Sequence, residues 1–194
     1  MKREHIYKIF SNIPTLETER FILRKMSVDD TDDMFEYSKR SDVTKYLTWS
    51  PHQSKAYTLD YLTYLQSRYK SGDFFDWAIV CRDTEKMIGS CGFTRFDFQH
   101  NAGEIGYVIN PEYAGQGIAT EVSARVIRFG FENLSLNRIE CKFMSDNLAS
   151  RRVMEKNGMV FEGIRRRAML IKGEYRDIGI CSILREEFFE QKDK

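Results

Sequence analysis

The spacing of apolar residues in the first part of the chain predicts one strand followed by two helices. Residues 20–26 alternate apolar and polar side chains, so we expect a strand with one face formed by Phe21, Leu23 and Lys25. Residues 27–40 carry acidic groups near their start, where carboxylates complement a helix dipole, and predict the first helix. A second helix is predicted over residues 55–70, with Ser54 as its cap and an apolar stripe of Leu59, Leu62, Leu65 and Tyr69.

The rest of the chain alternates between extended runs and helical patterns. The predicted strands are residues 76–82, 86–97, 102–110 and 137–144, and a closing antiparallel pair at 159–171 and 176–184. The predicted helices are residues 118–132 and 147–158, the second with Asn147 as its cap and Gly158 as its stop. Strands and helices in this order indicate an α+β fold with a mixed sheet.

Length, composition and net charge limit the classes of function that the chain could have. The chain has 194 residues, 42% of them hydrophobic and 30% charged, which fits one globular domain with a sizeable core. The formal net charge of +1 gives no electrostatic reason to expect a nucleic acid or membrane partner. No apolar run is long enough for a transmembrane helix, and the first residues lack the pattern of a signal peptide, so a cytoplasmic protein is expected.

The cysteines do not suggest a metal site. None of Cys81, Cys91, Cys141 and Cys181 belongs to a C-x-x-C pair, and the histidines do not cluster with them. Each cysteine lies in a predicted strand, where it is expected to be a small buried apolar residue in a reducing compartment.

Two glycines stand between a predicted strand and a predicted helix in the segment YAGQGIAT. Gly115 and Gly117 would let a ligand approach the main chain, and the helix N-terminus adds unpaired N–H donors, which suits an anion. On spacing alone, a flexible loop explains the glycines equally well. A P-loop is excluded because its motif is absent, and a dinucleotide fingerprint is disfavoured because Thr120 replaces its third glycine.

Four segments in order resemble the GNAT superfamily of N-acetyltransferases, and especially its RimJ/RimL subgroup. They are LETERFILRKMSVDDTDDMFEY, GEIGYVINPEY, YAGQGIATE and NLASRRVMEKNGMVFEG, and the resemblance covers about residues 15–188. It implies a single domain over residues 1–194, with a mixed, mostly antiparallel central sheet flanked by helices and with its fourth and fifth strands splayed apart. Ala114 departs from the usual motif, so some side-chain support of the glycine loop is expected to be lost.

The resemblance implies acetyl-CoA as co-substrate and no metal. The pyrophosphate would meet main-chain N–H groups of Gly115, Gln116, Gly117, Ile118, Ala119 and Thr120. The pantetheine arm would pair with the central strand at Tyr107, Val108 and Ile109, the last two of which could also supply an oxyanion N–H. Asn147 would contact the arm from the other side, or serve only as a helix cap.

The implied reaction is direct attack of a neutral amine on the thioester. Such an attack needs an acceptor for the proton of the ammonium and a donor for the departing thiolate. Glu104, before the central strand's IGY, is the expected base, and Ser150, the serine of N-x-x-S, the expected acid. Glu104 could instead be only a strand-end charge, and Ser150 only a helix residue.

The acceptor is expected to bind beside the early helices. Tyr46, Trp49 and Phe93 are the candidate substrate-binding residues, although all three could be core aromatics, and the Arg165–Arg167 run reads as a solvent-facing strand. The acceptor would be a protein N-terminus, such as that of a ribosomal protein, or a small amine, and the protein a monomer or homodimer. The alternative function is a non-catalytic acyl-CoA sensor on the same fold.

Overall fold

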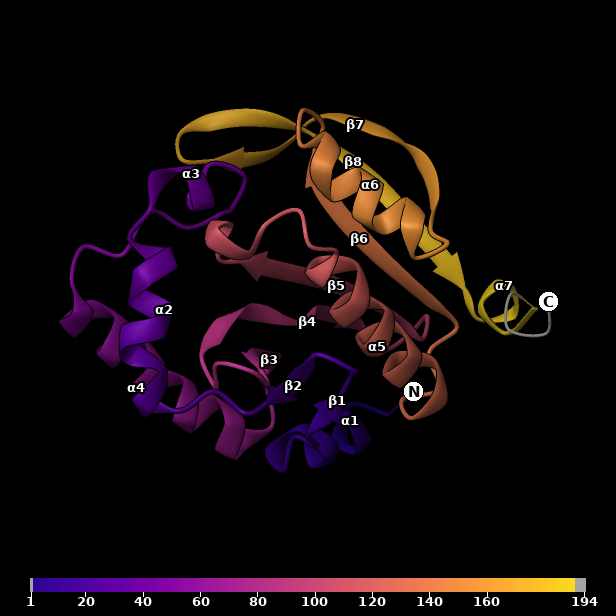
Figure 1. Ribbon diagram of the computed structural model, residues 1–194. Coiled ribbons are helices and arrows are strands. Elements are labelled where there is room, and N and C mark those ends of the chain that lie inside the picture. Colours follow the sequence, from indigo (N-terminus) through magenta and orange to yellow (C-terminus); the bar gives the residue numbers. More distant parts are fainter. Residues whose placement is uncertain (1, 191–194) are drawn as a thin grey trace.

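The computed structural model describes residues 2–190, in which eight strands form one sheet (Figure 1). The strands are β1 (Leu16–Glu17), β2 (Phe21–Arg24), β3 (Phe75–Cys81), β4 (Met87–Asp97), β5 (Ala102–Ile109), β6 (Arg138–Met144), β7 (Val160–Ile171) and β8 (Glu174–Leu184). Their order is β1-β2-β3-β4-β5-β6-β8-β7, and every neighbouring pair is antiparallel except the parallel pair β5–β6. The expected mixed, mostly antiparallel α+β sheet is confirmed.

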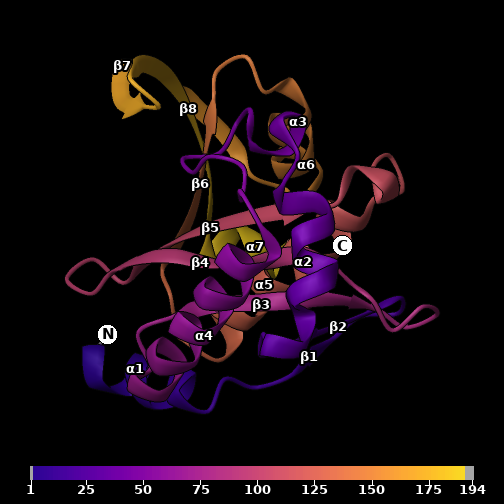
Figure 2. The same cartoon turned by 90° about the vertical axis from the view of Figure 1, so that its left-hand side faces the viewer.

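Helices cover both faces of the sheet (Figures 1 and 2). One layer contains α2 (Thr31–Ser38) and α4 (Lys55–Ser71), and the opposite layer contains α5 (Ile118–Glu132) and α6 (Leu148–Lys156). The remaining helices are α1 (Arg3–Ser11), the 3-10 turn η1 (Val28–Asp30), α3 (Ser41–Thr44), the 3-10 turn η2 (Pro111–Tyr113) and α7 (Arg185–Glu190). The sequence patterns predicted neither α1 nor α7.

The two faces of the central strands belong to different cores. The larger core packs aromatic rings of the sheet against α1 and α5, including Phe10, Trp77 and Phe129. The smaller core lies under α2 and α4 and includes Ala78 and Val80 of β3. Because side chains alternate along a strand, successive β3 residues contribute to opposite layers.

In two predicted elements, the residue that is buried lies one position away from the residue that was expected to be buried. Lys25 lies beyond the end of β2 and is exposed, whereas Met26 is buried. On α4 the buried stripe begins at Thr58 rather than at Leu59, whose exposed fraction is 43%. Thr58 tolerates burial because its hydroxyl lies 2.8 Å from the Nδ1 atom of His52.

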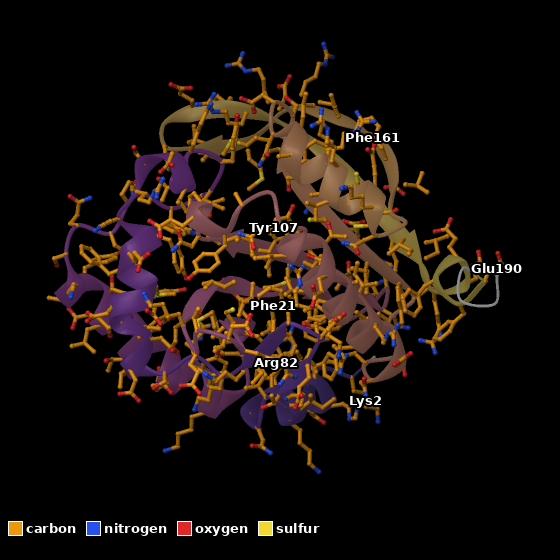
Figure 3. All side chains as sticks on the ribbon, in the orientation of Figure 1. Lys2, Phe21, Arg82, Tyr107, Phe161 and Glu190 are labelled. Atoms are coloured by element: carbon orange, nitrogen blue, oxygen red, sulfur yellow. The ribbon has the colours of Figure 1, made fainter. Side chains whose placement is uncertain are left out.

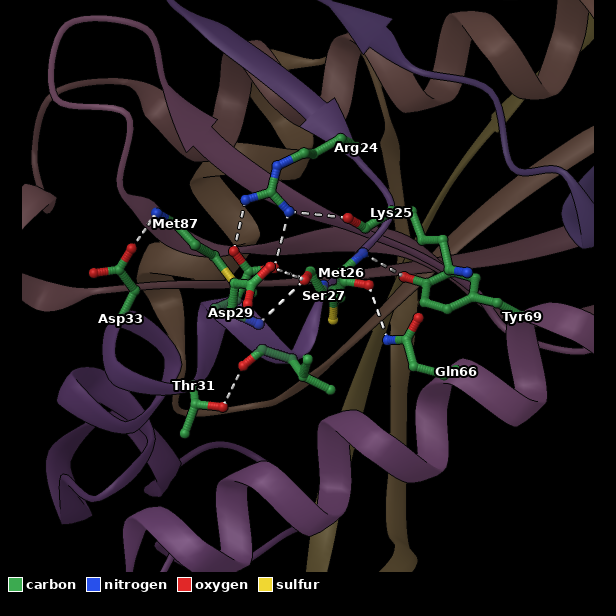
Figure 4. Close-up of polar contacts among 12 residues, drawn as sticks. Arg24, Lys25, Met26, Ser27, Asp29, Thr31, Asp33, Gln66, Tyr69 and Met87 are labelled. Atoms are coloured by element: carbon green, nitrogen blue, oxygen red, sulfur yellow. Dashed lines mark hydrogen bonds and ion pairs between the residues drawn. The ribbon is translucent and has the colours of Figure 1, made fainter.

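A polar network fixes the layer of α2 and α4 against the sheet (Figure 4). Arg24 of β2 makes a bidentate ion pair with the buried Asp30, with N–O distances of 2.6 and 2.9 Å. The Ser27 N–H donates to the same carboxylate in a capping box, and the Met26 N–H donates to the Tyr69 hydroxyl of α4. These contacts hold the two helices that form one side of the cavity described below.

Candidate active site

Strands β5 and β6 pair only over their first halves. The parallel register runs from Ala102 opposite Arg138 to Ile105 opposite Cys141, and β5 then continues to Ile109 while β6 continues to Met144 alongside β8. Figure 1 shows the two strands diverging beyond this point. Strands β5 and β6 are the fourth and fifth predicted strands, so their divergence confirms the expected splay. It leaves one edge of residues 106–109 without a strand partner.

A cavity of about 1230 Å³ opens at this divergence. It is lined by the second half of β5, by the loop that leads into α5, by the start of α6, and by side chains of α2 and α4. The cavity therefore joins the unpaired strand edge to both helical layers. A ligand could reach it from the glycine loop on one side and from the α2 and α4 layer on the other.

The glycine loop has the backbone that the motif requires. Gly115 and Gly117 have φ values of 78° and 75°, in the left-handed region that disfavours residues with a Cβ. A Cβ at Gly115 would meet no atom within 4 Å, so the space beside the loop is open. Gly117 precedes the first residue of α5, and no side chain caps this helix end. The open backbone and the uncapped helix start suit an anion such as pyrophosphate.

Arg20 holds the glycine loop against the start of α5. Its guanidinium donates to the main-chain oxygen of Gln116 at 3.1 Å and pairs with Glu121 of α5, with an N–O distance of 2.6 Å. This role could not be predicted from sequence pattern, because Arg20 and Gln116 are far apart in the chain. The expectation that Ala114 costs the loop some side-chain support stays a prediction.

Tyr107 and Ser150 bring two hydroxyl groups together across the divergence. The Tyr107 side chain, near the middle of the molecule in Figure 3, places its oxygen 2.9 Å from the Ser150 Oγ. Burial raises the pKa of the Tyr107 phenol, and the hydrogen bond to Ser150 opposes that rise. Asn147 caps α6 by accepting from the Ser150 N–H at 3.2 Å, so its expected role as a cap is confirmed. A contact of Asn147 with a ligand stays a prediction.

Glu104 lines the cavity, but its carboxylate already has partners. Lys142 of β6 lies 2.5 Å from Oε2, and the Thr94 hydroxyl donates to Oε1 at 3.1 Å. The side chain is only partly exposed, at 20%. Glu104 lies on the paired half of β5, next to the divergence, in an ion pair that the sequence did not predict. Its role as a base stays a prediction.

The expected substrate-binding aromatics fall into two groups. Tyr46 and Trp49 line the cavity, and Trp49 lies 5.4 Å from His52 between ring centroids. Phe93 also lines the cavity, but it is 2% exposed and stacks on Phe96 in the larger core. A contact of any of the three with a substrate stays a prediction. The arginines 165–167 are exposed on β7, as expected.

Three aspartates of the cavity were not singled out in the sequence, namely Asp42, Asp73 and Asp76, and the third has no ion-pair partner among residues 2–190. Asp76 of β3 lines its α2 and α4 side, and its Oδ1 accepts from the Trp77 N–H at 3.0 Å. Desolvation raises the pKa of this carboxyl to about 7, against the opposing hydrogen bonds of Ser90 and the Trp77 N–H. Asp76 is the first residue of the predicted strand 76–82, and a single polar residue at the end of a strand does not indicate a functional site.

Metal and membrane features are absent from the part of the chain that the structure describes. Among residues 2–190, no group of three or more histidine, cysteine, aspartate and glutamate side chains could hold a metal ion. Within the same range, every helix is too short or too polar to cross a membrane. The four cysteines are free thiols, and all but Cys81 are buried.

Comparison with known proteins agrees with the geometry. A model of the acetyltransferase (GNAT) domain matches residues 20–160. An uncharacterized N-acetyltransferase of Bacillus licheniformis is 32% identical over 174 residues, which span 90% of this chain and 98% of the relative.

Solved structures show the same architecture. A GNAT-family acetyltransferase from Bacillus anthracis matches with a TM-score of 0.79 at 28% identity, covering 89% of this chain and 99% of the other. The ribosomal L7/L12 alpha-N-protein acetyltransferase RimL, solved with coenzyme A, matches with a TM-score of 0.75 at 20% identity, covering 88% and 98%. The second likeness concerns the fold alone.

Proposed function

The chain belongs to the GNAT family of acetyl-CoA-dependent N-acetyltransferases, and from this premise we propose that it transfers acetyl from acetyl-CoA to a primary amine by direct attack in a ternary complex. One observation supports the proposal above others. The unpaired edge of β5 and the glycine loop at the start of α5 line the same cavity. A molecule with a phosphate end and an amide-rich arm fits both features at once.

Residues in the cavity match the two ends of acetyl-CoA. The main-chain N–H groups between Gly115 and Thr120 would hold pyrophosphate, with Arg20 keeping the loop in place. The arm would pair with main-chain groups of Tyr107, Val108 and Ile109, which lack a β6 partner. Sheet-like pairing of this kind satisfies backbone groups that would otherwise need water.

Two proton transfers are assigned to side chains at the divergence. Glu104 would accept a proton from the acceptor ammonium, directly or through water, and Lys142 would hold its carboxylate in place. The paired hydroxyls of Ser150 and Tyr107 would deliver a proton to the departing thiolate. A main-chain N–H of Val108 or Ile109 would stabilise the tetrahedral intermediate.

The experiment that tests the function measures release of the CoA thiol from acetyl-CoA. A panel of small amines and N-terminal peptides, including those of ribosomal proteins, would be offered as acceptors. Thiol release that depends on one class of acceptor, with acetylated product seen by mass, is the expected result. Tight acetyl-CoA binding with no transfer to any acceptor would favour the alternative, a non-catalytic acyl-CoA sensor.

A further inference from the structure

Asp76 occupies one end of a row of positions that crosses the sheet toward the divergence of β5 and β6. It lies opposite Gly92 of β4, and Gly92 lies opposite Gly106 of β5. Gly106 is the first β5 residue after the parallel pairing with β6 ends. The row therefore has one carboxylate followed by two positions without side chains, and it ends where the thioester of the proposed function would lie.

The carboxylate lies beside Gly92. A Cβ atom at Gly92 would clash with the Phe75 main-chain oxygen and the Asp76 Cα and would lie 2.8 Å from Asp76 Oδ1, so only glycine fits next to the acid. A Cβ at Gly106 would meet only the Thr94 methyl within 4 Å, at 3.0 Å. Asp76 is on β3 and the unpaired edge is on β5, so the backbone at the acid lies two strand spacings, about 10 Å, from that edge.

Among residues 2–190, no lysine or arginine forms an ion pair with Asp76. The other cavity acids have such partners: Glu104 pairs with Lys142, Asp42 at the rim with Arg40, and Asp73 with Arg68. Tyr69 of α4 donates to the main-chain oxygen of Asp76 at 2.7 Å and fixes the strand without neutralising the carboxylate. Asp76 is half-buried without a counter-ion among residues 2–190, so a cationic ligand would supply the compensating charge that the fold does not.

Aromatic rings form the wall above this acid. Tyr61 of α4 lines the cavity and is partly exposed, whereas Tyr37 of α2 is 2% exposed and belongs to the smaller core. The Asp76 charge contributes to raising the pKa of both phenols, after burial. His52 lies 5.8 Å from Tyr61 between ring centroids, and burial lowers the pKa of its imidazole, which keeps it neutral at neutral pH. The wall thus presents uncharged π faces next to one anion, a combination that binds organic cations.

We propose that Asp76 is the residue that anchors the positive charge of the acceptor, and that the acceptor is a cationic alkylamine seated between Asp76 and the ring of Tyr61. This proposal rests on the proposed acetyltransferase function and names its substrate class. The cationic group lies at Asp76, and the alkyl chain carries the reacting amine over Gly92 and Gly106 toward the edge of β5. Glycines at both positions leave the row clear for an alkyl chain, and the neutral Tyr61 ring covers it.

The test measures binding without turnover, in the complex of the protein with CoA. The probes are n-pentylammonium and 1-pentanol, which match in length and differ in charge. Calorimetric titration would compare the wild-type protein with Asp76→Asn, which keeps the shape and the acceptor for the Trp77 N–H. Asp42→Asn is the matched control, because it removes the same charge from the rim of the same cavity.

The wild-type protein is expected to bind pentylammonium at least about tenfold more tightly than pentanol, since hydrogen bonds to charged groups have about this strength. D76N should bring the two affinities close together, while D42N keeps the preference. A second variant, Tyr61→Leu, should weaken pentylammonium binding by a few fold and change pentanol binding less. Unchanged CoA affinity in each variant would show that the domain is folded.

A wild-type protein without preference for the cation, or a D76N protein that retains it, would overturn the inference. Failure of the proposed function gives a different result. In that case the cation preference would persist and depend on Asp76, but acetyl-CoA would release no thiol with any amine. The two failures are therefore distinguishable in one set of proteins.

Discussion

The hydroxyl of Tyr107 on β5 lies 2.9 Å from the hydroxyl of Ser150 on α6, across the divergence of the sheet. Because the two hydroxyls are hydrogen-bonded to each other, we expect them to donate a proton as a pair. The phenol has its pKa raised by burial, and the serine can pass a proton to or from it. The pair spans the side of the cavity where the leaving sulfur is expected.

Removing either hydroxyl should slow turnover more than it weakens acetyl-CoA binding. We expect Ser150→Ala and Tyr107→Phe each to lower kcat by about 10–100-fold with KM for acetyl-CoA nearly unchanged, because a proton donor acts mainly in the transition state. The double variant should be little worse than the poorer single variant, since the groups act as one unit. A rise in KM alone for Ser150→Ala would make the serine a binding residue.

Replacing Glu104 should separate proton transfer from packing. Glu104→Gln keeps the size of the side chain, and we expect kcat to fall by about 10²–10⁴-fold with acetyl-CoA affinity nearly intact. The mutant should partly recover at high pH, where more of the amine is neutral without help. Steady-state rates across a pH series would measure both effects.

Lys142→Met is the control for the ion pair of Glu104, which has an N–O distance of 2.5 Å. If loss of the ion pair alone explained the defect of E104Q, the lysine variant would show the same defect and the same pH profile. Near-normal rates and an unaltered profile in E104Q would instead leave Glu104 as a strand-end charge.

Substituting Gly117 should damage acetyl-CoA binding specifically. Gly117→Val forces a β-branched residue to φ near 75° and adds a side chain beside the expected pyrophosphate. We expect at least about a tenfold loss of CoA affinity, since several charged hydrogen bonds are affected.

Gly173 offers the matched control for this backbone strain. Its φ is 83° in the turn between β7 and β8, and a Cβ there would meet no atom within 4 Å. Gly173→Val should lower the melting temperature to a similar degree while leaving the CoA dissociation constant unchanged. Equal CoA affinity in the two variants would contradict the placement of pyrophosphate on the loop.

The sequence predicted those features that depend on local pattern. Cap residues, glycines with positive φ and apolar periodicity are encoded within a few residues, so Ser54, Asn147 and the glycine loop could be placed correctly. The splay of β5 and β6 was predicted only from the resemblance of the ordered motifs to a family.

Features that depend on distant residues were not predictable from pattern. The contact between Arg20 and Gln116 joins a strand and a loop that no local spacing relates. The position of Asp76 beside Gly92 follows from the register of β3 on β4, which periodicity does not give. Register also decides which side of the sheet each chemical group faces, because a shift of one residue reverses every side chain.

Asp76 also predicts a pH dependence of stability. Its pKa is raised from 3.8 to about 7 in the folded protein, chiefly by desolvation. A raised folded pKa means that the stabilising contribution is complete below about pH 4 and is lost as the pH rises through about 7. The titratable groups whose pKa the Asp76 charge affects are Tyr37 of α2, Tyr61 and Tyr69 of α4, and Cys91 of β4, none of which is a cation that could offset this loss.

Asp76→Asn should therefore stabilise the ligand-free protein at alkaline pH and not at acid pH. We expect a gain of about 1–2 kcal/mol at pH 8, less than full linkage because the side chain keeps some contact with solvent, and a rise of about 2–8 °C in Tm. The gain should shrink steadily between about pH 7 and pH 4. Asp42→Asn should show no such gain, because pairing with Arg40 lowers the pKa of Asp42. Thermal unfolding of the three proteins across this range would measure the effect, and a constant difference between wild type and D76N at all pH values would show that Asp76 titrates as an ordinary solvated acid.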